Sequence, residues 1–212
     1  MESSFWHKRW ESNEIGFHEY QANSLLVKYA KELALSEGSR IFVPLCGKTC
    51  DIPWLLANGY RVAGAELSRL AVEQLFQDNR IEPIISELGK LVRYSAENID
   101  IFVGDIFDLS LETLGPVDAT YDRAALVALP EEMRQAYTKH LIKITANKPQ
   151  FLISFEYDQH QMSGPPFSIN KAELNKHYLE SYTLSLIDSG DVKGGLKGRY
   201  PAIENAWLLG NK

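Results

Sequence analysis

The stretch "RIFVPLCGKTCDIPWLLANGYRVAGAELS", residues 40–68, decides the fold of this chain. It begins with "RIFVPL", whose apolar and β-branched residues predict a buried strand. The segment "CDIPWLLANG" predicts a helix closed by Gly59, and "RVAGAEL" predicts a second strand that ends at an acid, Glu66. A strand, a tight turn, a helix and a second strand with a terminal acid are typical of parallel α/β sheets that bind a nucleotide-like ligand.

The alternation of strands and helices extends along the rest of the chain. Helices are predicted in residues 23–35, 68–79, 130–145 and the end of 164–178, and strands in 99–105, the start of 117–126, 150–157, 182–190 and 204–210. Ser68 is expected to cap the second of these helices, and Ser168 or Asn170 the last. Residues 81–98 show no clear pattern and are expected to form a surface excursion.

This order of elements predicts an α/β fold with a mostly parallel sheet and helices on both faces. The last two predicted strands follow one another without a helix, so they are expected to form an antiparallel edge. Residues 1–212 contain no linker-like tract, and a single domain is expected.

Composition narrows the functional classes. The 212 residues are 45% hydrophobic and carry a net charge of −6, which argues against a nucleic acid as the main partner. No run approaches the roughly 18 apolar residues of a membrane-spanning helix, so no membrane partner is expected. The start is polar and contains Glu2, Glu11 and Glu14, unlike a secretory or mitochondrial leader, and a cytoplasmic location is expected.

The turn at residues 45–51 lacks the residues that two familiar kinds of turn require. The letters "GKT" at residues 47–49 suggest a phosphate loop, but that loop needs another glycine where this chain has Phe42. Cys46 and Cys50 are too few to bind zinc without further ligands nearby, so both are expected to be free thiols and no metal is expected.

A cofactor crevice at the strand ends is the third interpretation. Glu66 follows Gly47 by 19 residues, at the position where an acid accepts hydrogen bonds from ribose hydroxyls. A nicotinamide cofactor would require more glycines, because its pyrophosphate must approach the turn, whereas Pro44 stiffens this one. The turn is suited to a nucleoside ligand without phosphate, such as S-adenosylmethionine. Asp105 and Ile106, in "VGDIFD" after the next strand, could form the adenine slot.

Several segments together resemble the thiopurine S-methyltransferase family, in its bacterial branch. These segments are "FWHKRWESNEIGFHEYQANSLL" (5–26), "FVPLCGKTCDIPWLLANGYRVAGAELS" (42–68), "GDIFDL" (104–109), "YDRAALVALP" (121–130) and "GPPFSI" (164–169). The resemblance implies the Rossmann-like class I methyltransferase fold, with S-adenosylmethionine as cofactor and S-adenosylhomocysteine as product. It also implies that residues 1–22 form a lid over the cofactor site.

The resemblance assigns roles by position in this chain. It implies a cofactor site formed by Trp10, Leu45, Glu66, Asp105, Ile106 and Arg123. Phe17 and Arg123 would face the substrate, with Pro166 lining the same pocket. Residues 188–209 depart from the family pattern, and a second cation at the pocket would be Lys193, Lys197 or Arg199.

The family implies methylation of the sulfur of small aromatic or heterocyclic thiols, with thiopurines as model substrates. Arg123 would be catalytic by stabilising the thiolate, since a guanidinium stays protonated and cannot serve as a base. An ion pair to Asp122 or Asp105 is the structural alternative for Arg123. A monomer active in xenobiotic detoxification is expected.

Other functions stay open at this point. The acceptor could be a selenium or tellurium compound, a halide or an oxygen nucleophile, because the cofactor half of the site would look the same. A non-catalytic S-adenosylmethionine-binding protein is the alternative from another class, and a dehydrogenase is disfavoured by the missing glycines.

Overall fold

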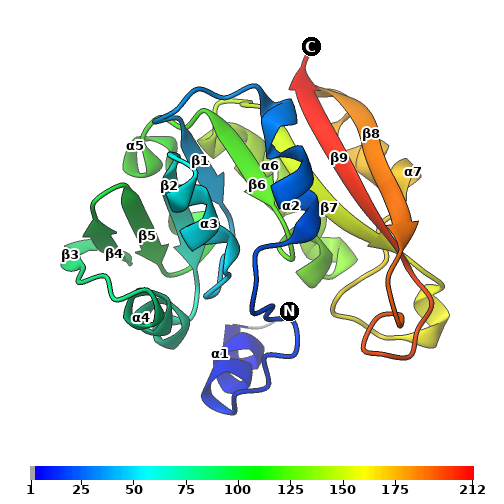
Figure 1. Ribbon diagram of the computed structural model, residues 1–212, viewed down its shortest axis with the longest axis horizontal. Helices are drawn as coiled ribbons and strands as arrows, with labels where there is room; N and C mark the ends of the chain where they lie inside the picture. The colour runs from blue at the N-terminus through cyan, green and yellow to red at the C-terminus, as the bar shows by residue number, and fades with distance from the viewer. Residues whose placement is uncertain (1–2) are drawn as a thin grey trace.

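The computed structural model describes residues 3–212, so the first two residues of the predicted lid lie outside it. Its centre is a nine-stranded sheet in the order β3-β4-β5-β2-β1-β6-β7-β9-β8 (Figure 1). The strands are β1 (Arg40–Val43), β2 (Arg61–Glu66), β3 (Ile84–Leu88), β4 (Leu91–Ala96), β5 (Ile99–Val103), β6 (Ala119–Asp122), β7 (Gln150–Glu156), β8 (Tyr182–Asp191) and β9 (Ile203–Asn211).

The middle of the sheet is parallel and both of its edges are antiparallel. Strands β5, β2, β1, β6 and β7 run parallel to one another. The predicted hairpin of β8 and β9 adds an antiparallel edge beside β7. The α/β fold class and this edge are therefore confirmed.

A second antiparallel edge lies in residues 81–98, where the sequence indicated a surface excursion but did not predict strands. This segment contains β3 and β4, which form a hairpin next to β5. β3 has no buried side chain, and Ile84 is 77% exposed. A strand without a buried face lacks the alternation of apolar and polar residues that identifies strands in a sequence.

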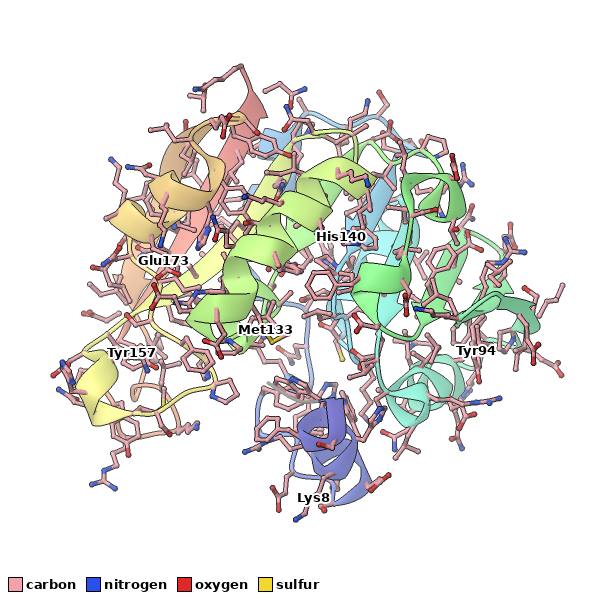
Figure 2. All side chains as sticks on the ribbon, turned by 180° about the vertical axis from the view of Figure 1, so that it is seen from behind. Lys8, Tyr94, Met133, His140, Tyr157 and Glu173 are labelled. Carbon is pink, nitrogen blue, oxygen red and sulfur yellow. The ribbon has the colours of Figure 1, made fainter. Side chains whose placement is uncertain are left out.

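Helices cover both faces of the sheet, as predicted. The helical elements are α1 (Ser3–Glu11), α2 (Ser24–Tyr29), η1 (Ala30–Leu33), α3 (Asp51–Ala57), α4 (Arg69–Asp78), η2 (Ile106–Asp108), α5 (Leu111–Leu114), η3 (Leu126–Ala128), α6 (Glu131–Ile144), η4 (Gln159–Gln161) and α7 (Lys171–Tyr178). One hydrophobic cluster joins the sheet to α2, α3 and α4, and another joins its opposite face to α5, α6 and α7. Figure 2 shows α6 lying across the second face, with Met133 and His140 along it.

Strand β1 illustrates how this packing follows from the sequence. Phe42 belongs to one hydrophobic cluster, whereas Ile41 and Val43 belong to the other. Each is at most 2% exposed, and burying a side chain of this size contributes about 1.5–3 kcal/mol to folding. A strand buried on both faces reads as a continuous apolar run, which is why residues 40–45 were recognisable.

The helix caps were predicted in part. Ser68 caps α4 by accepting a hydrogen bond from Ala71 N. Asn170 caps α7, whereas Ser168 bonds the backbone of Tyr157 instead. Within residues 3–212, no helix is both long and apolar enough to cross a membrane.

Candidate active site

The turn after β1 bends back towards the end of β2. Leu45 and Gly47 both have positive φ angles, 46° and 52°, and Cys46 N donates to Ala65 O at 2.9 Å. This geometry brings Gly47 N within 2.7 Å of Glu66 Oε2. The turn and the acid that the sequence singled out are therefore in direct contact.

Glu66 is a buried carboxylate held by backbone donors. Its Oε1 accepts from Ser68 N at 2.7 Å, while its Oε2 accepts from Gly47 N. Burial raises the pKa of Glu66, and the hydrogen bonds from Ser68, Gly47 and Leu67 act in the opposite direction. Each carboxylate oxygen can accept more than one hydrogen bond, so these contacts leave acceptor capacity for the two hydroxyls of a ribose.

Asp105 and Ile106 lie at the end of the neighbouring strand. Val103 of β5 pairs with Glu66, and Gly104 N donates to Glu66 O at 2.9 Å. Asp105 is exposed and caps η2 through Phe107 N, while Ile106 is 6% exposed. The structure thus places both residues beside Glu66, at the carboxyl edge of the sheet.

The N-terminal segment covers the same edge. Trp10 is 5% exposed and lies against Gly47, and α1 is seen below the strand ends in Figure 1. Phe17 is 38% exposed and makes edge-to-face contacts with Trp10 at 5.7 Å and with Trp6 at 5.8 Å between ring centres. The rings of Trp6, Trp10 and Phe17 form an aromatic cover next to the turn.

Gly47→Ala is expected to reduce the free energy of unfolding by about 1–3 kcal/mol. A Cβ atom at Gly47 would lie 2.9 Å from Trp10 Cζ2, and the φ angle of 52° strains any other residue. Chemical denaturation measures the effect. Gly16→Ala is the matched control, because a Cβ at Gly16 meets no atom within 4 Å. Equal free energies of unfolding for the two variants would show that the Trp10 ring does not restrict the space beside Gly47.

Arg123 follows β6 and is held by two carboxylates, although not by Asp122 or Asp105. Its Nη1 lies 3.3 Å from Asp51 Oδ2, and its Nη2 lies 2.5 Å from Glu19 Oε1. Burial acts to lower the pKa of the Arg123 guanidinium, but Asp51, Tyr121 and Glu19 together raise it. The guanidinium therefore stays charged.

Asp51 was missed in the sequence although it starts α3, directly after the turn. It is 1% exposed, and its Oδ1 accepts from Asn23 N at 2.7 Å. Its Oδ2 accepts from Tyr121 OH at 3.2 Å as well as from Arg123. A charged residue in the first turn of a helix beside the strand ends was the available signal. Glu19, in the aromatic segment, carried no such signal.

Asp122 has a structural role beside the site. It is fully buried, accepts from Leu126 N at 3.0 Å and from Tyr137 OH at 2.7 Å, and shapes the chain after Arg123. Burial raises the pKa of Asp122 to about 6, against the opposing effect of these hydrogen bonds.

Asp122→Asn is expected to gain stability relative to the wild type as pH rises from about 4 to about 6. The folded wild-type protein holds the Asp122 proton to about pH 6, whereas the unfolded chain releases it near pH 3.8, so unfolding becomes easier across this window. The difference in unfolding free energy between variant and wild type should grow by about 3 kcal/mol. Denaturation at pH 4 and 7 measures it, with Asp191→Asn on the exposed end of β8 as control. A constant difference would contradict the assignment.

The loop that contains Pro166 is tied to the segment after Arg123. Phe167 N donates to Val127 O at 2.6 Å, and Tyr157 OH donates to Pro166 O at 2.7 Å. Pro166 is half-buried, and its loop is joined to η3, which begins three residues after Arg123.

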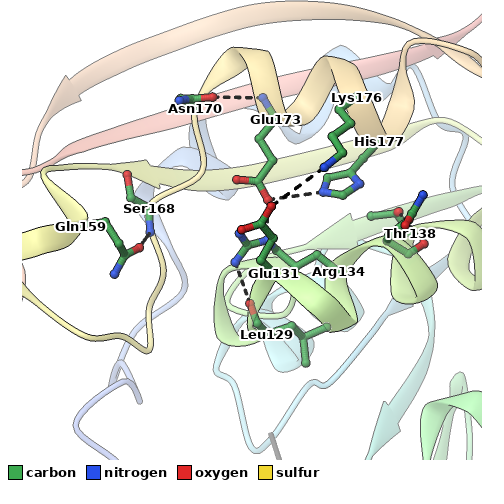
Figure 3. A network of polar contacts seen from close by, with 11 residues as sticks. Leu129, Glu131, Arg134, Thr138, Gln159, Ser168, Asn170, Glu173, Lys176 and His177 are labelled. Carbon is green, nitrogen blue, oxygen red and sulfur yellow. Dashed lines mark hydrogen bonds and ion pairs between the residues drawn. The ribbon is translucent and has the colours of Figure 1, made fainter.

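A partly buried ion pair between α6 and α7 lies next to this loop. Arg134 Nε donates to Glu173 Oε1 at 2.5 Å, and its Nη1 donates to Leu129 O at 2.9 Å (Figure 3). The Arg134 guanidinium also lies 5.7 Å from the centre of the Phe167 ring. His177 Nε2 lies 3.3 Å from the same oxygen of Glu173. The start of α6, the loop and α7 are thereby joined.

Lys193, Lys197 and Arg199 are exposed on the loop between β8 and β9. The Arg199 guanidinium lies over the Tyr200 ring at 5.4 Å. This loop is anchored by a small cluster in which Leu196 and Ala202 accompany Met162. The choice among the three cations therefore stays a prediction.

Both cysteines are free thiols, as predicted. Burial, and then the charge of Glu66, raises the pKa of Cys46, while burial and Asp51 raise that of Cys50. Thiols with raised pKa values are poor nucleophiles and poor metal ligands. Among residues 3–212, no group of three His, Cys, Asp or Glu side chains is placed to hold a metal ion.

Solved structures with the same architecture define the class of protein. 1,6-Didemethyltoxoflavin-N1-methyltransferase from Burkholderia thailandensis, solved with bound 1,6-didemethyltoxoflavin and S-adenosylhomocysteine, aligns with a TM-score of 0.67 and 13% identity over 99% of this chain and 87% of that one. Magnesium protoporphyrin IX methyltransferase from Synechocystis, solved with S-adenosylmethionine, aligns with a TM-score of 0.65 and 13% identity over 97% and 96%. The fold is that of class I S-adenosylmethionine-dependent methyltransferases.

Sequence comparison identifies the family. The model of the thiopurine S-methyltransferase family matches residues 1–202. A thiopurine S-methyltransferase of Xanthobacter autotrophicus is 53% identical over 210 residues, covering 99% of both chains. One from Gluconobacter oxydans is 49% identical over 203 residues, covering 96% of this chain and 92% of its own. The chain belongs to the thiopurine S-methyltransferase family.

Proposed function

We propose that this protein transfers the methyl group of S-adenosylmethionine to the sulfur of small aromatic or heterocyclic thiols, with thiopurines as model substrates. One observation carries the proposal. At the carboxyl edge of the sheet, a buried acid, Glu66, bonds the turn that Trp10 covers, and a charged guanidinium, Arg123, follows β6 at the same edge. Family membership supports the same reaction.

The cofactor half of the site uses residues at the ends of β1, β2 and β5. Glu66 would accept hydrogen bonds from the ribose hydroxyls, and Asp105 and Ile106 would flank the adenine. Leu45 and Trp10 border the turn at Gly47, where the amino-acid end of the cofactor would lie near Arg123. S-adenosylmethionine supplies a methyl group that is already activated on a sulfonium, so the proposal includes no metal.

The proposed acceptor half of the site consists of the aromatic rings of the N-terminal segment and the loop that contains Pro166. Phe17 presents a partly exposed ring, and Pro166 lies on the loop joined to η3. Arg123 would stabilise the thiolate form of the acceptor, which is the nucleophilic form. The thiol proton would leave to water, and the acceptor sulfur would take the methyl group as its bond to the sulfonium breaks, leaving S-adenosylhomocysteine. The protein would serve mainly to align the reactants and exclude water.

Calorimetric titration with S-adenosylhomocysteine, followed by incubation with S-adenosylmethionine and mercaptopurine, tests the proposal. Binding together with formation of the S-methylated product is the expected result. Binding without product would transfer the proposal to another acceptor, such as a halide or a selenium or tellurium compound, or to a binding-only role. Absence of binding would remove the cofactor site altogether.

The cellular setting belongs to the proposal as well. The net charge of −6 supports an enzyme that acts on small molecules and not on nucleic acid. We infer a cytoplasmic monomer that detoxifies foreign thiols, with residues 1–22 as its lid. Size-exclusion chromatography combined with light scattering tests the monomeric state.

A further inference from the structure

The two carboxylates on Arg123 differ in how firmly they are held. The Asp51 side chain is 2% exposed and is fixed by Asn23 N and Tyr121 OH in addition to Arg123. The Glu19 side chain is 48% exposed and lies on the irregular segment between α1 and α2. Asp51 is therefore a permanent partner of the guanidinium, whereas Glu19 occupies its solvent side.

A third carboxylate strengthens the negative charge around Arg123. Glu204, on β9, is half-buried, and its pKa is raised by burial and then by the charge of Glu19, while Arg123 lowers it. Burial, and then the charges of Lys48 and Arg123, lower the pKa of His18, whereas Asp78 and Glu19 act in the opposite direction. An anion that approaches Arg123 therefore meets carboxylates that already neutralise it.

Phe17 is adjacent to this contact along the chain. Its ring is partly exposed and contacts Trp6 and Trp10 by its edges, two residues before Glu19. An aromatic acceptor that packs against Phe17 would act on the segment that carries Glu19. Contact of the acceptor ring with Phe17 and displacement of the Glu19 carboxylate from Arg123 would then occur together.

We propose that Glu19 is a specificity-determining residue, which occupies Arg123 until an acceptor bearing both a negative charge and an aromatic ring displaces it. This inference rests on the proposed function and deepens it. Every anion has to compete with Glu19 for the guanidinium, and the ring supplies the additional binding free energy. Small inorganic anions lack the ring and are excluded, which disfavours halides and oxyanions as acceptors.

Glu19→Gln tests the competition, because glutamine keeps the shape and one oxygen acceptor but removes the charge. Two non-reactive probes, benzenesulfonate and benzenesulfonamide, share a ring and differ in charge. Calorimetry should show that benzenesulfonate binds about tenfold tighter to Glu19→Gln than to the wild type. The affinity of benzenesulfonamide should be the same for both proteins. Thiocyanate, an anion without a ring, should gain affinity by a similar factor.

Glu14→Gln is the matched control, since it removes the same charge from the same segment. Glu14 pairs with Arg9 at 4.0 Å and its side chain is 66% exposed. Both probes should bind this control with the same affinity as they bind the wild type. Glu19→Ala, with a thermal melt of each variant, shows that an effect does not arise from misfolding.

The outcomes separate this inference from the proposed function. Equal affinity of benzenesulfonate for the wild type and for both Glu19 variants would overturn the competition, even if the wild type methylates mercaptopurine. An equal gain for the sulfonamide would also overturn it, because the effect would then not depend on charge. A wild type that fails to methylate mercaptopurine would instead refute the proposed function.

Discussion

Replacing Arg123 with lysine is expected to lower kcat/KM for mercaptopurine by about a hundredfold, while S-adenosylhomocysteine affinity changes less. The planar guanidinium contacts Asp51 through one nitrogen and Glu19 through the other. A lysine ammonium keeps the positive charge but cannot span both carboxylates in this geometry. Steady-state kinetics of the thiol and calorimetry of S-adenosylhomocysteine measure the two effects separately.

Arg9→Lys provides the control for Arg123→Lys. Arg9 lies in α1, where it pairs with Glu14 and lies over the Phe5 ring, so the same exchange is made at an arginine that does not contact Asp51 or Glu19. This control should retain full activity. Full thiol turnover in Arg123→Lys would remove Arg123 from the mechanism and leave it as an anchor for Asp51.

Glu66→Ala is expected to weaken binding of S-adenosylhomocysteine by about a hundredfold or more. Two hydrogen bonds from ribose hydroxyls to a carboxylate are worth about 1.5–3 kcal/mol each. The variant also leaves Gly47 N and Ser68 N without their buried acceptor, so the free energy of unfolding should fall by about 1–3 kcal/mol. Calorimetry and denaturation measure these losses.

Glu66→Gln separates binding from folding. Its amide keeps one oxygen for the backbone donors but loses an acceptor, so an intermediate affinity with smaller destabilisation is expected. Glu87→Ala, on the exposed strand β3, is the control for loss of an acidic side chain. If Glu66→Ala binds S-adenosylhomocysteine as tightly as the wild type, Glu66 does not hold the ribose.

The fold was predictable where the signals are local. Residues 40–68 contain a buried strand, a turn, a helix and another buried strand in immediate succession, and the structure has each of them. The cap at Ser68 was predictable for the same reason. Residues 81–98 were not, because β3 pairs by its backbone and exposes its side chains, so little of its stability is encoded in apolar periodicity.

The positions that meet at the carboxyl edge of the sheet were predictable, whereas their contacts were not. Parallel strands end at one edge, so Glu66, Asp105 and Arg123 could be assigned to that edge from the strand order. The contacts of Arg123 with Asp51 and Glu19 join segments far apart in sequence, since Asp51 and Arg123 are 72 positions apart. Spacing gives no information on such pairs, and the nearer Asp122 was a plausible but incorrect partner.

The outer strand β3 has a consequence for handling this protein in concentrated solution. Its free edge offers unpaired backbone groups, and Ile84 and Ile85 are 77% and 51% exposed on it. Such an edge is a template for strands of other molecules, and proteins commonly discourage this with charges such as Glu87. Self-association through β3 is therefore expected far from the carboxyl edge, and Ile84→Lys should raise the solubility of the chain without altering that edge.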